Sequence, residues 1–196
     1  MSVLADEKHH IVQGEYFVSD DPRAVVSTIL GSCVAACMRD PVAGIGGMNH
    51  FLLPGEGGQE GLRYGAYAME LLVNGLLQRG ARRDRLEAKL FGGGRLLKGL
   101  TDIGGQNADF AERFLQDEGI AYEGGSLRGE HARRIQFWPA TGRVRQQRLV
   151  GDATVFAVEG RPPARRPLSG DIEMFDDPGA GRRSRAPAVS NDLELF

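Results

Sequence analysis

Short apolar runs that end at a glycine or just before a proline occupy most of residues 24–53, and they constrain the fold more than any other feature. Three of them cover Ala24 to Leu30, Val34 to Arg39 and Gly44 to Leu53. The first is apolar and contains several β-branched residues, which favour strands. Asp40-Pro41 separates the second run from the third, because a residue before proline is disfavoured in the helical region. The pattern predicts adjacent short strands.

Two segments have helical periodicity instead. Between Arg63 and Arg79, apolar residues recur at every fourth position in two neighbouring rows, and Gly80 is placed to end this helix. Asn107 is expected to cap a second helix that closes at Gly119.

Further strands are expected in both halves of the chain. They cover His10 to Val18, Leu86 to Phe91, Ile120 to Tyr122, Arg133 to Phe137, Arg143 to Leu149 and Val155 to Val158. Strands therefore outnumber helices and cluster at both ends of the chain. We predict an α/β (α+β) sandwich, in which a β-sheet core has its helices packed outside, rather than regular βαβ winding.

Length and proline distribution predict one domain followed by a tail. A chain of 196 residues is long enough to bury a sizeable core. Five of the nine prolines follow position 160, where neither helical nor strand periodicity is present. We predict a single domain over residues 1–160 and a mobile tail over residues 161–196. The glycine-rich segment Gly55 to Gly61 is either a connecting loop or a flap beside the site described below.

Charge and hydropathy exclude several classes of protein. The formal net charge of -2 argues against a nucleic-acid-binding protein, which usually has a strongly basic face. No run of about 18 apolar residues is present, so no membrane span is expected. The N-terminus lacks the apolar core of a signal peptide. We therefore expect a cytoplasmic protein, and we expect it to be a monomer.

The two cysteines, Cys33 and Cys37, differ in their surroundings. They are too few for a disulfide scaffold, and with four scattered histidines they make a poor structural zinc site, so no metal is predicted. Cys37 lies within an apolar run and is predicted to be a core residue. Cys33 follows Gly31-Ser32, a turn whose N–H groups can form an oxyanion hole.

A cysteine nucleophile needs a base within hydrogen-bond reach and a group that orients the base. His50 lies on the next apolar run, so two adjacent strands joined by a turn would place it beside Cys33. The hydroxyl of Thr28 can orient the imidazole. Each residue also has a structural reading, as a buried core thiol, a hydrogen-bonded core histidine and a strand threonine. Asn49 is an alternative orienting group or a turn residue.

The sequence around these residues resembles the chemoreceptor glutamine deamidase family, CheD. The resemblance lies in T-I-L-G-S-C-V-A from Thr28 to Ala35 and in G-G-M-N-H-F-L-L-P from Gly46 to Pro54. Further matches lie along the chain from about residue 11 to 150. They include G-E-Y-F-V from Gly14, L-F-G-G-G from Leu90, I-G from Ile103 with Asn107, and T-G from Thr141.

The resemblance implies a fold and a reaction. Family members convert selected glutamines of methyl-accepting chemotaxis receptors to glutamate and release ammonia through a cysteine thioester. Their α/β sandwich has a catalytic arrangement similar to that of bacterial toxin deamidases. The resemblance implies a catalytic triad of Cys33, His50 and Thr28, with no metal and no cofactor. Further candidates are Gly31 and Ser32 for the oxyanion hole, and Asn49, Phe51, Gly92 and Gly93 for substrate or partner contacts.

Two other functions stay open from the sequence. An adaptor would bind receptors, or the CheC phosphatase that some family members bind, with little turnover. A cysteine protease or transglutaminase would share the Cys–His chemistry.

Overall fold

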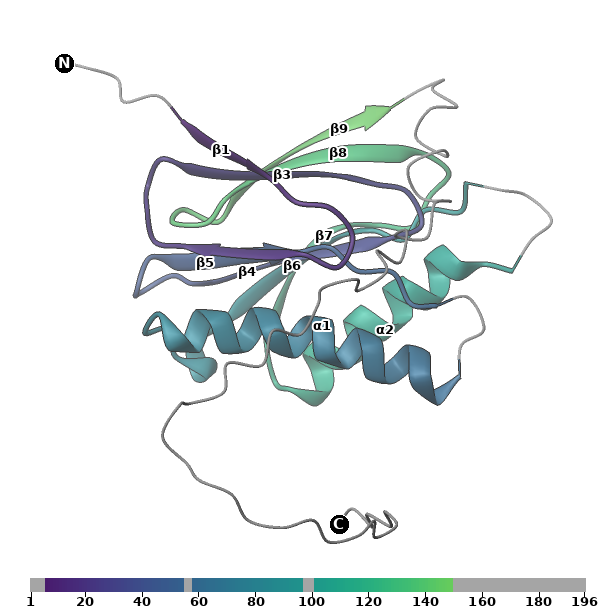
Figure 1. The fold of residues 1–196 in the computed structure, drawn as a ribbon, viewed down its shortest axis with the longest axis horizontal. Coiled ribbons are helices and arrows are strands. Elements are labelled where there is room, and N and C mark those ends of the chain that lie inside the picture. The colour runs from purple at the N-terminus through teal and green to yellow at the C-terminus, as the bar shows by residue number, and fades with distance from the viewer. Residues whose placement is uncertain (1–5, 55–57, 97–100, 150–196) are drawn as a thin grey trace, which may run out of the picture. The chain divides into compact units, whose positions relative to one another are not determined.

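The strands form two sheets of mixed direction that stack face to face (Figure 1). The computed structural model describes residues 6–54, 58–96 and 101–149, which all belong to one compact unit. The four-stranded sheet has the order β1-β3-β8-β9, with β1 Glu7–His10, β3 Ala24–Leu30, β8 Ala132–Trp138 and β9 Arg143–Leu149. The five-stranded sheet has the order β2-β5-β4-β6-β7, with β2 Tyr16–Ser19, β5 Ile45–Asn49, β4 Val34–Asp40, β6 Glu87–Gly92 and β7 Ala121–Leu127.

Two helices cover the outer face of the five-stranded sheet (Figure 1). They are α1, Gln59–Gln78, and α2, Ile103–Asp117, and a short 3-10 helix, η1, spans Arg83–Arg85. One apolar core fills the space between this sheet and the helices, and a second fills the space between the two sheets. The predicted sandwich with a sheet core and helices outside is confirmed.

The first four strands alternate between the sheets, and this path creates the candidate site. β1 and β3 lie side by side in parallel, so both end at the same edge of the four-stranded sheet. From that edge the chain crosses twice to the five-stranded sheet, first through residues 11–15 and then through residues 31–33. Two segments far apart in sequence are therefore brought to the same end of the sandwich.

The structure corrects several predicted boundaries. The segment predicted as one extended stretch, His10 to Val18, is divided between β1 and β2 because the chain changes sheets there. The helix predicted from Arg63 begins at Gln59 instead. Asn107 is not a cap: Asp102 caps α2 by accepting a hydrogen bond from the Gly105 N–H, and Asn107 lies inside the helix.

Several predictions fall outside the described residues. They are the strand Val155 to Val158, the tail 161–196 and, within the glycine-rich segment, residues 55–57. The predicted hairpin near the C-terminus is confirmed as β8 and β9, and Gly80 and Gly119, both with positive φ, follow the ends of α1 and α2 as expected.

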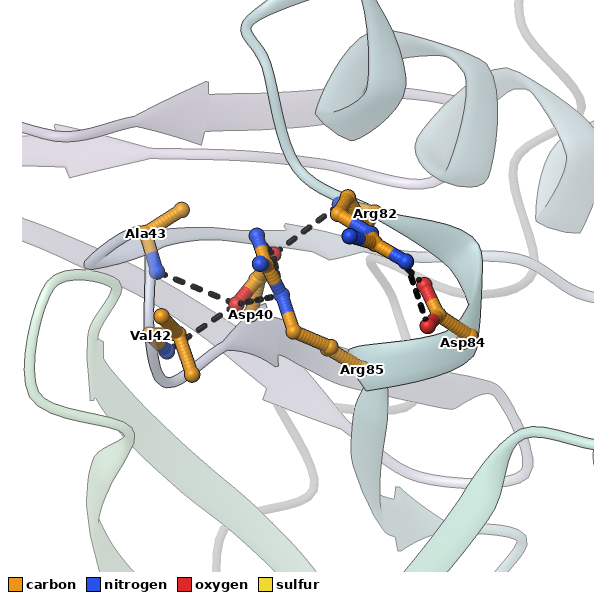
Figure 2. Close-up of polar contacts among 6 residues, drawn as sticks. All are labelled: Asp40, Val42, Ala43, Arg82, Asp84 and Arg85. Atoms are coloured by element: carbon orange, nitrogen blue, oxygen red, sulfur yellow. Dashed lines mark hydrogen bonds and ion pairs between the residues drawn. The ribbon is translucent and has the colours of Figure 1, made fainter.

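The turn predicted at Asp40-Pro41 depends on one buried carboxylate (Figure 2). Asp40 accepts hydrogen bonds from the N–H groups of Val42, Ala43 and Arg82 and from the guanidinium of Arg85. Burial alone would raise the pKa of Asp40, but these hydrogen bonds outweigh it and hold the pKa well below its usual range. The carboxylate thus ties the β4–β5 turn to the segment between α1 and β6.

We predict that Asp40→Asn lowers the free energy of unfolding by about 3 kcal/mol, because it leaves the partly buried Arg85 without its buried counter-charge. The depressed pKa stabilises the fold above the unfolded-state value, so this part of the stability is lost as the pH falls below about 4. Urea unfolding at neutral and acidic pH measures both effects. Asp84→Asn, which breaks the exposed pair with Arg82, is the matched control and should change little. Equal losses of unfolding free energy in Asp40→Asn and Asp84→Asn would contradict the stabilising role assigned to the buried Asp40 carboxylate.

Candidate active site

The pairing of β4 with β5 places Cys33 and His50 on one face. Cys37 lies opposite Met48, and the register continues to an isolated bridge between Val34 and Phe51. Side chains alternate between faces along a strand, so Cys33 lies on the same face as Cys37, toward the four-stranded sheet. The same register places His50 on that face, diagonally across from Cys33.

Thr28 reaches this face from the opposite sheet. Its Oγ1 lies 2.8 Å from His50 Nδ1 and donates a hydrogen bond of 2.8 Å to the Ile11 carbonyl oxygen. A hydroxyl has a single proton, and that of Thr28 is donated to the Ile11 carbonyl. Oγ1 therefore accepts a hydrogen bond from Nδ1–H of His50. The network therefore assigns the proton of neutral His50 to Nδ1 and leaves the lone pair on Nε2.

His50 is held as a neutral base. Burial, with a smaller contribution from the charge of His10, lowers the pKa of His50 to about 4. Within the described part of the chain, buried Nε2 has no hydrogen-bond partner. An unpaired, unprotonated ring nitrogen on the face that carries a thiol is what general-base chemistry requires.

The backbone on either side of Cys33 is fixed by the glycine loop after β6. The Gly93 N–H donates to the Cys33 carbonyl at 2.8 Å, and the Gly94 N–H donates to the Gly31 carbonyl at 2.7 Å. Gly92 has φ +105°, and a Cβ there would lie 2.1 Å from the Cys33 carbonyl oxygen. Only glycine permits this close approach. Gly92 and Gly93, predicted as contact residues, thus lie against the backbone of Cys33.

Asn107 joins the two segments that carry Cys33 and His50. From inside α2, its Nδ2 donates to the Ser32 carbonyl at 3.1 Å and to the Ile103 carbonyl at 2.9 Å. Its Oδ1 accepts from the Leu53 N–H at 2.7 Å. The prediction of a helix cap missed this role, although the spacing of Asn107 after Ile103-Gly104 was the signal that could have indicated it.

Two predicted contact residues lie on the other face. Asn49 accepts a hydrogen bond from the Ala36 N–H and donates one to the Ala68 carbonyl, on the side of α1. Phe51 packs on the same side, with its ring centroid 5.8 Å from that of Phe110. The structure does not bring Asn49 and Phe51 together with Cys33, because strand alternation directs them toward the helices.

The two thiols have different environments. Cys37 is buried in the core between the sheets, as predicted, and burial raises the pKa of its thiol well above the usual range. Cys33 is buried as well, but its Sγ–H donates to Oε1 of Gln13 at 3.9 Å. Sequence analysis did not single out Gln13, because nothing in the local pattern marks a contact between two separate crossings.

Other kinds of site are not supported in the described ranges. Residues 6–54, 58–96 and 101–149 contain no cluster of three or more histidine, cysteine or acidic side chains suited to a metal ion. None of the helices in these ranges is long and apolar enough to cross a membrane.

Comparison with known proteins identifies the family. Residues 52–148 match the family described as CheD chemotactic sensory transduction. A relative from Caulobacter sp. (strain K31), named probable chemoreceptor glutamine deamidase CheD, is 59% identical over 174 residues, which is 86% of this chain and 93% of the relative. A relative of the same name from Acidiphilium cryptum (strain JF-5) is 61% identical over 176 residues, covering 85% and 92%. The chain belongs to the CheD family.

Among solved structures, a hypothetical protein from Bacillus licheniformis, YfiH, is similar over 62% of this chain and 59% of its own. The sequence identity is 14% and the TM-score is 0.38.

We predict that His50 stays neutral as the pH falls to about 4 and keeps its proton on Nδ1. In the unfolded chain the His50 imidazole binds a second proton near pH 6.5, so the fold loses stability as the pH drops from about 6.5 toward 4. Long-range ¹H–¹⁵N NMR spectra report both tautomer and titration. Thr28→Val removes the hydroxyl that accepts from Nδ1–H, so the His50 proton should no longer be confined to Nδ1. A proton on Nε2 in the unmodified protein would refute the assignment.

Asn107→Ala should lower the free energy of unfolding by about 2 kcal/mol, because it leaves the buried Leu53 N–H without its acceptor. Urea unfolding measures the loss, and hydrogen exchange of the Leu53 amide should accelerate. Asn74→Ala, at an exposed position inside α1, is the matched control. Unchanged exchange at Leu53 would show that Asn107 does not hold this segment.

Proposed function

We propose that this chain is a protein-glutamine deamidase that converts glutamines of methyl-accepting chemotaxis receptors to glutamate. In this proposal Cys33 is the nucleophile, His50 the general base and Thr28 the group that orients His50. The names of relatives at about 60% identity support the substrate class. The observation that carries the catalytic assignment is the Thr28–His50 hydrogen bond, since it leaves a lone pair on Nε2 on the face that bears Cys33.

The first half of the reaction forms a thioester. Nε2 of His50 takes the proton of the Cys33 thiol, and the thiolate attacks the carboxamide carbon of the substrate. Backbone N–H groups at the Gly31-Ser32-Cys33 turn stabilise the negative charge that develops on the amide oxygen. The carbon–nitrogen bond then breaks, and His50 gives its proton to the departing ammonia.

The second half returns the free enzyme. Water enters, His50 takes a proton from it, and the resulting hydroxide attacks the thioester carbon. The carbon–sulfur bond breaks, His50 returns its proton to the Cys33 thiolate and so restores the thiol, and the substrate leaves as glutamate. All proton transfers use His50, so the reaction needs water as its only co-reactant.

The proposed catalytic unit is residues 1–160, with residues 161–196 as a separate tail, since the residues of the proposed triad and oxyanion hole all lie between Thr28 and His50. A cytoplasmic location follows from the same chemistry, because a reducing compartment keeps Cys33 as a thiol. We also propose that the chain is a monomer and that it binds a CheC phosphatase.

We predict that Cys33→Ala abolishes deamidation of receptor glutamines, whereas Cys37→Ala retains it. Cys33 follows the Gly31-Ser32 turn that would supply the oxyanion hole, while burial raises the pKa of the Cys37 thiol and disfavours its thiolate. Mass spectrometry of receptor peptides, after co-expression with each variant, detects the replacement of NH₂ by OH. Deamidation by the Cys33→Ala variant at the unmodified rate would overturn the assignment, and so would complete loss in a folded Cys37→Ala variant.

A further inference from the structure

The three residues of the proposed triad are closed off from solvent. The exposed fractions are 0% for Cys33, 6% for His50 and 1% for Thr28. A glutamine side chain of another protein cannot touch the Cys33 sulfur while this arrangement persists. Some part of the chain must move before a substrate reaches the thiol.

The segment that lies over the triad is the first crossing between the sheets, residues 11–15, called here the crossover segment. The Ile11 carbonyl accepts the Thr28 hydroxyl, and the Gly14 N–H donates to the His50 carbonyl at 2.8 Å. The Glu15 carbonyl accepts from the His50 N–H at 3.0 Å. Both ends of the crossover segment are thus held by the residues that it covers.

The middle of the crossover segment is a closed turn with few ties to the core. The Val12 N–H donates to the Glu15 carboxylate, and the Glu15 N–H donates to the Val12 carbonyl, both at 3.0 Å. Val12, Gln13 and Gly14 are exposed residues. Because the turn buries little apolar surface, displacing it costs less than opening either sheet. An open surface hollow lies beside it, lined by Lys8, His9 and Tyr16 among others.

Gln13 stands at this turn and presents a carboxamide to the nucleophile. The Cys33 Sγ–H donates to its Oε1 at 3.9 Å. The proposed reaction acts on the side chain of a substrate glutamine. Gln13 places the same chemical group in contact with the Cys33 sulfur, which is the proposed nucleophile. The thiol faces the amide oxygen rather than the carbon, so this contact occupies the thiol without presenting the bond that would break.

We propose that Gln13 is an internal substrate mimic, whose carboxamide occupies the subsite for the substrate glutamine until the substrate displaces it. The proposal rests on the function proposed above and adds a competitor to it. Displacement couples two events, because the move that removes Gln13 also uncovers Cys33. Without a partner, the thiol is then exposed only in the fraction of molecules whose crossover segment is displaced, and a bound substrate holds that open state.

Two variants test the proposal. Gln13→Ala removes the carboxamide, and Gln13→Asn keeps it on a side chain one methylene shorter that falls short of the sulfur. Val12→Ala, an exposed position in the same segment, is the matched control. The probe is alkylation of Cys33 by iodoacetamide, followed by peptide mass mapping. It needs no receptor, so it is independent of deamidase activity.

Both Gln13 variants should alkylate Cys33 on the order of tenfold faster than the unmodified protein, since apparent reactivity scales with the open fraction. With receptor as substrate, Gln13→Ala should lower KM and leave kcat unchanged, as expected when a competitor is removed. Val12→Ala should match the unmodified protein in both assays.

Alkylation of Cys33 at an unchanged or slower rate in the Gln13 variants would overturn the proposal. Conversion of Gln13 itself to glutamate in the unmodified protein, but not in Cys33→Ala, would also overturn it, since Gln13 would then be an internal substrate. If either result is obtained while receptor deamidation is intact, the proposal for Gln13 fails but the proposed deamidase function does not. Loss of the proposed function would appear instead as receptor deamidation that persists without Cys33.

Discussion

The hydrogen bond between Thr28 and His50 is the interaction on which the site depends, because its two partners belong to different sheets. Thr28 lies on β3 of the four-stranded sheet, and His50 follows β5 of the five-stranded sheet. The apolar core between the sheets fixes their separation, so the packing of the sandwich sets the orientation of the imidazole. The Ile11 carbonyl completes the arrangement by accepting the hydrogen bond of the Thr28 hydroxyl. Oγ1 can then only accept from Nδ1–H, so the lone pair of the ring stays on Nε2. Fold and chemistry are thus connected through one threonine.

The proposed site combines a neutral imidazole, His50, with a buried thiol, Cys33. Burial disfavours protonation of His50, and the same burial keeps solvent and stray electrophiles from Cys33. A cysteine enzyme that acts on selected side chains of another protein gains from such closure, because its thioester would otherwise be open to other acceptors. The glycine loop after β6 and Asn107 hold the backbone around Cys33, while the exposed turn at residues 12–14 of the crossover segment lies over it. Two segments therefore meet at Cys33: the glycine loop that fixes its backbone, and the crossover segment whose displacement we propose.

Local patterns in the sequence were sufficient for the parts of the fold that depend on neighbouring residues. The strands around Val34 and Gly47, the Asp40 turn and the glycine that ends α1 follow from alternation, proline and glycine. The pairing of Cys33 with His50 on one face was predictable for the same reason, since one turn joins their strands. Contacts between distant segments left no such signal. Asn107 was interpreted as a cap because its hydrogen bonds to Ser32 and Leu53 appear only when α2 packs on the sheet. Gln13 meets Cys33 only because β1 and β3 are parallel and end at one edge.

Direct detection of the covalent intermediate tests the central claim of this account, a thioester on Cys33. Protein and receptor are mixed, quenched in acid at short times and analysed by intact and peptide mass spectrometry. The account predicts a covalent adduct between Cys33 and a receptor side chain, cleaved by hydroxylamine, present with Cys37→Ala and absent with Cys33→Ala. Glutamate formed at the full rate with the adduct absent or mapped to another residue would contradict it.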